Sequence, residues 1–216
     1  MHAVNTLRIT EIFYSLQGEA RTVGVPTVFV RLTGCPLRCT WCDTTYSFNG
    51  GKTLTQEEVL AQVAHYGCKT VCVTGGEPLA QKACIPFLSA LCDLGYAVSL
   101  ETSGYLDISP VDKRVSRVVD IKCPGSGEVD KNRWQNMDLI NDHDQLKFVL
   151  KDRADFDWAL QCIAEQKLAN RCEIFFSPVF ESLPPKELAQ WILDSRAPVR
   201  MQVQLHKLLW GVEQGR

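Results

Sequence analysis

Three cysteines lie close together near the start of the chain, in the segment RLTGCPLRCTWCDT. Cys35, Cys39 and Cys42 follow the spacing Cys-x3-Cys-x2-Cys, and no fourth cysteine stands beside them. A structural zinc site is the simplest alternative, but such sites close with four ligands, usually as two separated pairs, and here a histidine would have to arrive singly from elsewhere. Three thiolates suit a four-iron cluster that leaves one iron open for an outside ligand. We therefore predict that these residues hold an iron–sulfur cluster.

The other cysteines do not form a second motif. Most of them stand among apolar neighbours, where a cysteine packs as a small hydrophobic side chain. The N-terminal stretch has no basic start followed by an apolar core, so we expect no secretory signal and a cytoplasmic protein, whose reducing environment argues against disulfides. These scattered residues are Cys68, Cys72, Cys84, Cys92, Cys123, Cys162 and Cys172.

The composition is that of an ordinary globular protein. Of the 216 residues 45% are hydrophobic, and the formal net charge is −2. This balance gives no electrostatic reason to bind nucleic acid. No apolar run approaches the roughly 18 residues that a membrane span needs. Because no linker or repeat divides the chain, we predict a single domain over residues 1–216, with a cluster-binding loop at 35–52.

Segments that suit strands alternate with segments that suit helices. Thr55 and Glu58 form a possible capping box, Asp152 can cap a later helix, and Pro184-Pro185 suits a first helical turn. Alternation of this kind predicts βαβ units and a parallel sheet. The predicted strands are 27–32, 70–74, 97–101, 117–122, 145–150, 173–179 and 200–206.

The chemically unusual segments follow these strands directly. The cysteine segment follows the first strand, GGEP (75–78) the second, TSG (102–104) the third and CPGSGE (123–128) the fourth. In parallel α/β folds the active site forms at the carboxyl ends of the strands. A complete eightfold barrel usually needs about 250 residues, and the connection 102–116 shows no clear helix. We therefore predict an α/β fold, a partial, open TIM-like parallel β/α barrel with this chemistry gathered at one mouth.

The cysteine spacing, the aromatic Trp41 before the last cysteine and the GGEP segment together resemble the radical S-adenosylmethionine superfamily. The resemblance implies a [4Fe–4S] cluster whose open iron binds the amino and carboxylate groups of S-adenosylmethionine. One electron then cleaves the sulfonium and yields a 5′-deoxyadenosyl radical that abstracts a hydrogen atom. The implied S-adenosylmethionine contacts are Trp41, Asp43, Glu77, Gly104, Asp120, Lys122, Ser177, Pro178, Val179 and Phe180.

Longer segments narrow the resemblance. EIFYSLQGEARTVGVPTVFVRLTGCPLRCTWCDT, TGGEP, ETSG and QLHKLLWG resemble the 7-carboxy-7-deazaguanine synthase family, over nearly the whole chain. The implied activity is that of a lyase that contracts the ring of 6-carboxy-5,6,7,8-tetrahydropterin with loss of ammonia, on the route to queuosine and related 7-deazapurines. Where the family often has LQGEG, this chain has Ala20.

The resemblance also implies roles for single residues. Thr44 would be a Mg²⁺ ligand, and a hydroxyl oxygen is a reasonable hard ligand for that ion. Arg31 would bind the substrate carboxylate, for which a guanidinium fork is well shaped. A homodimer and an electron donor such as flavodoxin or ferredoxin are further implications. The implied substrate contacts are Leu16, Gln17, Gly18, Arg31, Thr102 and His206.

Two other functions remain open at this stage. One is an activase of the same superfamily, which would install a glycyl radical on a partner enzyme; Arg31 disfavours it, since a protein substrate needs no carboxylate clamp inside the mouth. The other is a non-catalytic zinc or iron–sulfur module, which one zinc and no sulfide in anaerobically purified protein would favour. Single residues also have simpler interpretations: a structural ion pair for Arg31, a core position for His206, a tight turn for Gly75 and Gly76.

Overall fold

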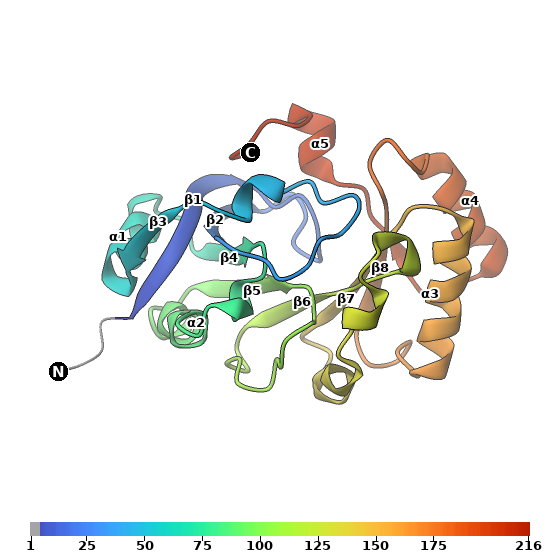
Figure 1. Cartoon of the computed structure of the whole chain (residues 1–216), viewed down its shortest axis with the longest axis horizontal. Coiled ribbons are helices and arrows are strands. Elements are labelled where there is room, and N and C mark those ends of the chain that lie inside the picture. The colour runs from blue at the N-terminus through green and yellow to red at the C-terminus, as the bar shows by residue number, and fades with distance from the viewer. Residues whose placement is uncertain (1–4) are drawn as a thin grey trace.

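A nine-stranded open sheet forms the centre of the molecule in the computed structural model, which describes residues 5–216 (Figure 1). The strand order is β3-β1-β2-β4-β5-β6-β7-β8-β9, so β3 and β9 are its two edges. The result is the partial, open barrel that the sequence predicts. The strands are β1 (Thr6–Leu16), β2 (Pro26–Leu32), β3 (Lys52–Thr55), β4 (Thr70–Gly75), β5 (Ala97–Thr102), β6 (Ser116–Ile121), β7 (Gln145–Leu150), β8 (Glu173–Pro178) and β9 (Arg200–Met201).

The sheet is parallel from β2 to β9, as expected, but β1 pairs antiparallel with both β2 and β3. The sequence pattern did not predict β1 or β3. A parallel βαβ pattern gives no reason to look for them, because a strand that runs antiparallel needs no crossover helix. The last predicted strand, 200–206, is also wrong beyond Met201, since β9 pairs only with Phe175 and Phe176. The chain then turns into a short helix that carries His206.

The helix ends follow the signals in the sequence. Thr55 and Glu58 form the capping box at the start of α1, Asp152 accepts a hydrogen bond from the Asp155 amide at the start of α3, and Pro185 is the first residue of α4. In the described residues the α-helices are α1 (Gln56–His65), α2 (Cys84–Asp93), α3 (Arg153–Glu165), α4 (Pro185–Ser195) and α5 (Leu205–Trp210), and short 3-10 turns lie at Thr45–Ser47, Pro78–Ala80, Pro124–Ser126, Val129–Lys131 and Trp134–Leu139.

The two faces of the sheet differ because side chains alternate along each strand. On β7, Leu146, Phe148 and Leu150 belong to the hydrophobic core beneath the helices, while Lys147 and Val149 line a cavity on the other face. The same alternation on β2, β5 and β6 places apolar residues in the core and Arg31, Glu101 and Asp120 in the cavity.

Residues 17–25, here called the closing loop, join β1 to β2 and extend to the strands at the other end of the sheet. The Ala20 amide donates to the Gln202 side chain at 2.6 Å, and that side chain donates back to the Ala20 carbonyl at 2.9 Å. The Arg21 amide donates to the Gln145 side chain on β7. Ala20 has φ +64°, a left-handed conformation that glycine adopts more easily. The two bonds to Gln202 hold it there, so the closing loop bridges the opening of the sheet.

Candidate active site

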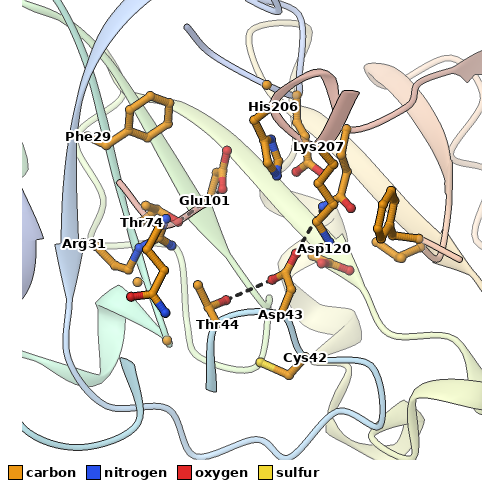
Figure 2. Close-up of a pocket in the computed structure, with 18 of the residues that line it drawn as sticks. Phe29, Arg31, Cys42, Asp43, Thr44, Thr74, Glu101, Asp120, His206 and Lys207 are labelled. Carbon is orange, nitrogen blue, oxygen red and sulfur yellow. Dashed lines mark hydrogen bonds and ion pairs between the residues drawn. The ribbon is translucent and has the colours of Figure 1, made fainter. Parts of the chain in front are cut away.

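A cavity of about 580 Å³ opens at the carboxyl ends of the parallel strands. It is bounded by the closing loop, the cysteine segment, α5 and the C-terminal residues 211–216. Figure 2 shows Arg31, Glu101 and His206 turned toward one space, with Cys42 and Asp120 at its border. A cavity of this size lies within the range of small-molecule sites. The predicted gathering of chemistry at the strand ends is therefore present.

The three cysteines stand on a loop that packs closely against the GGEP turn. The Glu77 amide donates to the Gly34 carbonyl at 2.8 Å. A Cβ on Gly76 would lie 2.3 Å from that same carbonyl oxygen and 2.7 Å from Cβ of Cys35. Glycine is thus required at position 76 because the two backbones touch. The GGEP turn thereby fixes the position of the cysteine loop relative to the end of β4.

The arrangement of the thiols fits a cluster better than a single ion. Cys35, Cys39 and Cys42 are free, half-buried and line the cavity. Within residues 5–216, no group of three or more His, Cys, Asp or Glu side chains converges as one metal ion would require. In a four-iron cluster each thiolate binds a different iron, so the sulfurs need not converge on one point. Burial raises the pKa of Cys39, and the nearby Lys122 ammonium opposes that rise.

Arg31 forms the cavity wall on β2. Its Nε donates to Glu11 Oε1 on β1 at 2.7 Å, and Glu11 lies directly opposite Arg31 in the antiparallel register. The guanidinium carbon lies 5.8 Å from the ring centroid of Phe13 and 5.9 Å from that of Tyr46. The structural ion pair considered from sequence is therefore present, and Arg31 also faces the cavity.

Glu101 projects from β5 into the middle of the cavity (Figure 2). Its Oε2 accepts a hydrogen bond from the Thr74 hydroxyl at 3.1 Å. Burial raises the pKa of Glu101 above its ordinary value of 4.5, although Lys147 and Arg31 act in the other direction. In the described part of the chain, no cation forms an ion pair with this carboxylate within 4.0 Å. Glu101 is thus a carboxylate with acceptor capacity left over for a ligand.

A buried network of charges forms the opposite wall. Lys147 Nζ lies 2.7 Å from Glu19 Oε2 and 3.9 Å from Asp120 Oδ2, and Lys122 Nζ lies 3.0 Å from Asp120 Oδ2. The Lys147 and Glu19 side chains are only 11% and 10% exposed. Asp120 and Lys147 are register partners on β6 and β7. The network therefore joins two strands to the closing loop.

His206 closes the cavity from α5. A Cβ on Gly18 would lie 2.1 Å from His206 Nδ1, so a larger residue at this point of the closing loop would displace the imidazole. Burial lowers the pKa of His206 from its ordinary value of 6.5, so the ring is neutral at pH 7. The next residue, Lys207, pairs with Asp43 at 2.8 Å and holds the pKa of Asp43 at about 2, although burial acts in the opposite direction.

Most residues expected at the site line this cavity. They include Thr44, whose hydroxyl donates to Asp43 Oδ1 at 3.1 Å (Figure 2). The residues of the expected set that line it are Leu16, Gln17, Gly18, Arg31, Cys35, Cys39, Trp41, Cys42, Asp43, Thr44, Thr102, Asp120, Lys122, Val179, Phe180 and His206.

Four expected residues do not line the cavity. Glu77 is fully buried, and its carboxylate accepts hydrogen bonds from Leu79, Thr102 and Ser103. Gly104 instead presents its carbonyl to the Asn136 side chain. Ser177 and Pro178 are buried at the end of β8. The contacts with S-adenosylmethionine expected for these four residues stay predictions.

Other residues of the cavity were not singled out from sequence. Thr74, Glu101 and Lys147 lie within or at the end of strands, where they were counted as strand residues. A usable signal was present, because each is polar at a position that alternates with buried apolar residues. Glu19 had no comparable signal, since its partner Lys147 is 128 residues away.

Known proteins resemble this chain in both sequence and fold. Residues 29–124 match the model of the radical SAM superfamily. A 7-carboxy-7-deazaguanine synthase of Chlorobaculum tepidum is 45% identical, with 95% of this chain and 94% of that protein covered. One of Koribacter versatilis is 40% identical, with 96% and 98% covered. The fold resembles the crystal structure of QueE from Escherichia coli with a TM-score of 0.78 and 22% identity, covering 95% of this chain and 100% of that one.

Over residues 5–216 no helix has the length and apolar character needed to cross a membrane. The relatives are similar over nearly their full length as well as that of this chain. The chain therefore belongs to the 7-carboxy-7-deazaguanine synthase family, within the radical SAM superfamily.

Proposed function

We propose that the chain is a carbon–nitrogen lyase that converts 6-carboxy-5,6,7,8-tetrahydropterin to 7-carboxy-7-deazaguanine with loss of ammonia. The product would enter the biosynthesis of queuosine, a tRNA modification, and of related 7-deazapurines. One observation carries the proposal: a single cavity contains three thiols, the guanidinium of Arg31 fixed by Glu11, and the carboxylate of Glu101, which has acceptor capacity left for a ligand. One hydrophobic core continues from β1 to α4, which supports a single catalytic domain.

The cofactors would occupy the side of the cavity nearest the cysteines. When bound, a [4Fe–4S] cluster and S-adenosylmethionine supply the radical that abstracts a hydrogen atom from the substrate. Cys35, Cys39 and Cys42 would hold the iron, and Trp41 would lie along the adenine. The closing loop and α5 narrow the mouth, which favours exclusion of water from the reacting groups.

The substrate would bind between Arg31 and Glu101. Its carboxylate matches the fork of Arg31, and a charge-assisted pair of this kind is strong and directional. The 2-amino-4-oxo ring of a pterin carries adjacent N–H donors, and the two oxygens of Glu101 can accept both. Gln17 can donate and accept at the same edge. The neutral ring of His206 can donate one hydrogen bond and accept another without adding a charge to the cavity.

A Glu101→Gln variant should lower kcat/KM roughly ten- to hundredfold, because an amide presents a donor where an acceptor is needed and leaves a buried N–H unpaired. The ionised form of Glu101 predominates only above its raised pKa. The wild-type kcat/KM should therefore fall as the pH drops, starting above the ordinary glutamate value of 4.5, and this limb should be absent from the variant. A pH profile of both proteins tests this; the same acidic limb in both would exclude Glu101 as its source.

Mg²⁺ would bind at Thr44, beside the Asp43 carboxylate. Hydroxyl and carboxylate oxygens are suitable ligands for this ion, which usually keeps several waters and uses few protein ligands. A Thr44→Ala variant should need a higher Mg²⁺ concentration for half-maximal activity. A magnesium titration checks this, and an unchanged dependence would count against Thr44 as the ligand.

The remaining properties concern the surroundings of the enzyme. We expect a cytoplasmic homodimer that receives electrons from a flavodoxin or ferredoxin. The exposed edges of an open sheet give a physical reason for self-association, because unpaired backbone groups favour a partner. These expectations rest on the resemblance and on the open strand order.

The function can be tested anaerobically. Protein with a reconstituted cluster is supplied with reductant, S-adenosylmethionine, Mg²⁺ and 6-carboxytetrahydropterin, and products are identified by mass spectrometry. Formation of both 5′-deoxyadenosine and 7-carboxy-7-deazaguanine is expected. Deoxyadenosine without the deazaguanine would leave radical chemistry but point to another substrate, such as the glycine of a partner enzyme. Neither product from protein with an intact cluster would contradict the proposal.

A further inference from the structure

The guanidinium of Arg31 is held on three sides. Its Nε edge donates to Glu11 Oε1 at 2.7 Å, and the rings of Phe13 and Tyr46 lie within 6 Å of its central carbon. Phe13 is itself fixed by stacking on Phe29, with ring centroids 4.9 Å apart and planes 8° apart. A side chain that loses its rotational freedom before binding gives up less entropy when a ligand arrives.

The fourth side of the guanidinium is its open edge. Over residues 5–216, neither Nη atom of Arg31 has a hydrogen-bond partner, and Arg31 lines the cavity. The two Nη groups form the edge of the fork that binds a carboxylate through parallel bonds. Glu11 therefore occupies only the inner edge and leaves the outer edge for a ligand.

Glu11 is in turn held by a residue of the cysteine loop. The Tyr46 hydroxyl donates to Glu11 Oε1 at 2.8 Å, so one carboxylate oxygen accepts from both Tyr46 and Arg31. Tyr46 lies in the 3-10 turn Thr45–Ser47, four residues after Cys42. The hydrogen bond thus connects the segment that would hold the iron to the strand that would hold the substrate.

From these contacts we infer that Glu11 and Tyr46 are positioning residues that orient Arg31 for the carboxylate of the substrate. They act through Arg31 and determine selectivity for a carboxylated ligand. The inference rests on the proposed function, because it takes the carboxylate of the pterin as the ligand of Arg31. Charge alone makes the opposite prediction, since the negative Glu11 weakens the attraction of Arg31 for an anion.

The test compares two ligands that differ only in the carboxylate. The dissociation constants of 7-carboxy-7-deazaguanine and of 7-deazaguanine are measured with the reconstituted holoenzyme in the presence of S-adenosylmethionine and Mg²⁺. In Glu11→Leu the preference for the carboxylated ligand should fall about tenfold, in line with the loss of one charge-assisted contact. Glu11→Gln keeps an acceptor for Arg31 and Tyr46 and should stay within threefold of wild type.

A second variant covers the case in which Glu11→Leu does not fold. Tyr46→Phe removes only the hydroxyl and should lower the preference roughly two- to fivefold, as expected for one hydrogen bond. Its matched control is Tyr66→Phe, since the Tyr66 hydroxyl donates to the Ile12 carbonyl on the same strand, away from the cavity. The control should leave both dissociation constants unchanged, and all folded variants should bind 7-deazaguanine as wild type does.

Three results would overturn the inference. The first is a preference in Glu11→Leu equal to or greater than that of wild type, which is what charge alone predicts. The second is an equal loss of affinity for both ligands, which indicates a general structural role. The third is a wild-type enzyme without any preference for the carboxylate, and this outcome alone would also contradict the proposed function.

Discussion

A Cys39→Ser variant is expected to form no detectable 7-carboxy-7-deazaguanine and to retain less iron and sulfide after reconstitution. Cys39 lines the cavity together with Cys35 and Cys42, and the chain offers no fourth thiol in the cysteine segment that could replace it. A serine hydroxyl loses its proton far less readily than a thiol does, and it is a poor ligand for the irons of such a cluster. Anaerobic product analysis and iron and sulfide determination measure the two effects together.

The matched control is Cys92→Ser. Cys92 is a partly buried cysteine on α2 that does not line the cavity. This variant should keep the iron and sulfide content of wild type and its rate of product formation. Equal loss of iron in both variants would mean that reconstitution, rather than ligation by the cysteine segment, limits the metal content. Full iron content in Cys39→Ser would exclude Cys39 as a ligand.

A Lys147→Met variant is expected to lose about 3–5 kcal/mol of unfolding free energy, as is typical when one partner of a buried charge pair is removed. Lys147 is the cation between Glu19 and Asp120, and both it and Glu19 are about nine-tenths buried. Burial alone would raise the pKa of Glu19, but the adjacent ammonium outweighs it and the pKa is lowered. Methionine fills a similar volume but leaves the Glu19 charge without compensation.

The pH dependence of this loss follows from the sign of the shift. A carboxylate with a lowered pKa contributes stability that is present above its ordinary pKa, here 4.5, and is lost as the pH falls through the lower value in the folded protein. The difference between wild type and Lys147→Met should therefore be largest near neutral pH and should shrink in acid. Urea unfolding at several pH values measures it.

An exposed ion pair provides the control for this prediction. Arg153 and Asp157 pair on the surface of α3 with side chains 58% and 57% exposed. Removing that pair with Arg153→Met should cost less than about 1 kcal/mol, since water already solvates both charges. If Lys147→Met cost no more than this control, the network would not be a stabilising element of the fold.

The sequence is sufficient to predict the parallel part of the fold, for reasons that are local. The strands β2 and β4 to β8 are short apolar segments. Three helices follow the capping signals: Thr55 and Asp152 are the N-caps of α1 and α3, and Pro185 is the first residue of α4. β1 could not be predicted in this way, because its antiparallel pairing depends on a strand rather than on a helix. The predicted strand 200–206 was too long because, in the described part of the chain, β9 finds only Phe175 and Phe176 as partners.

The residues of the site likewise divide into those that a local pattern predicts and those that depend on contacts between distant segments. Cys35, Cys39 and Cys42 carry their chemistry in their spacing, and their position after a strand predicts where they lie. Glu101 and Lys147 face the cavity because side chains alternate between the two faces of a strand, and each has a contact on a neighbouring strand. The pairing of Glu19 with Lys147 is purely tertiary, and no pattern within either segment predicts it.

The closing loop has a consequence for how the protein folds during its synthesis on the ribosome. Its anchors, Gln145, Lys147 and Gln202, leave the ribosome long after the loop itself, because synthesis proceeds from the N-terminus. Cys35, Cys39 and Cys42 are therefore exposed on the nascent polypeptide while the wall beside them is still missing. The cavity stays open on that side until the last tenth of the chain has been translated. Iron and sulfide can therefore reach the cysteines before the cavity closes.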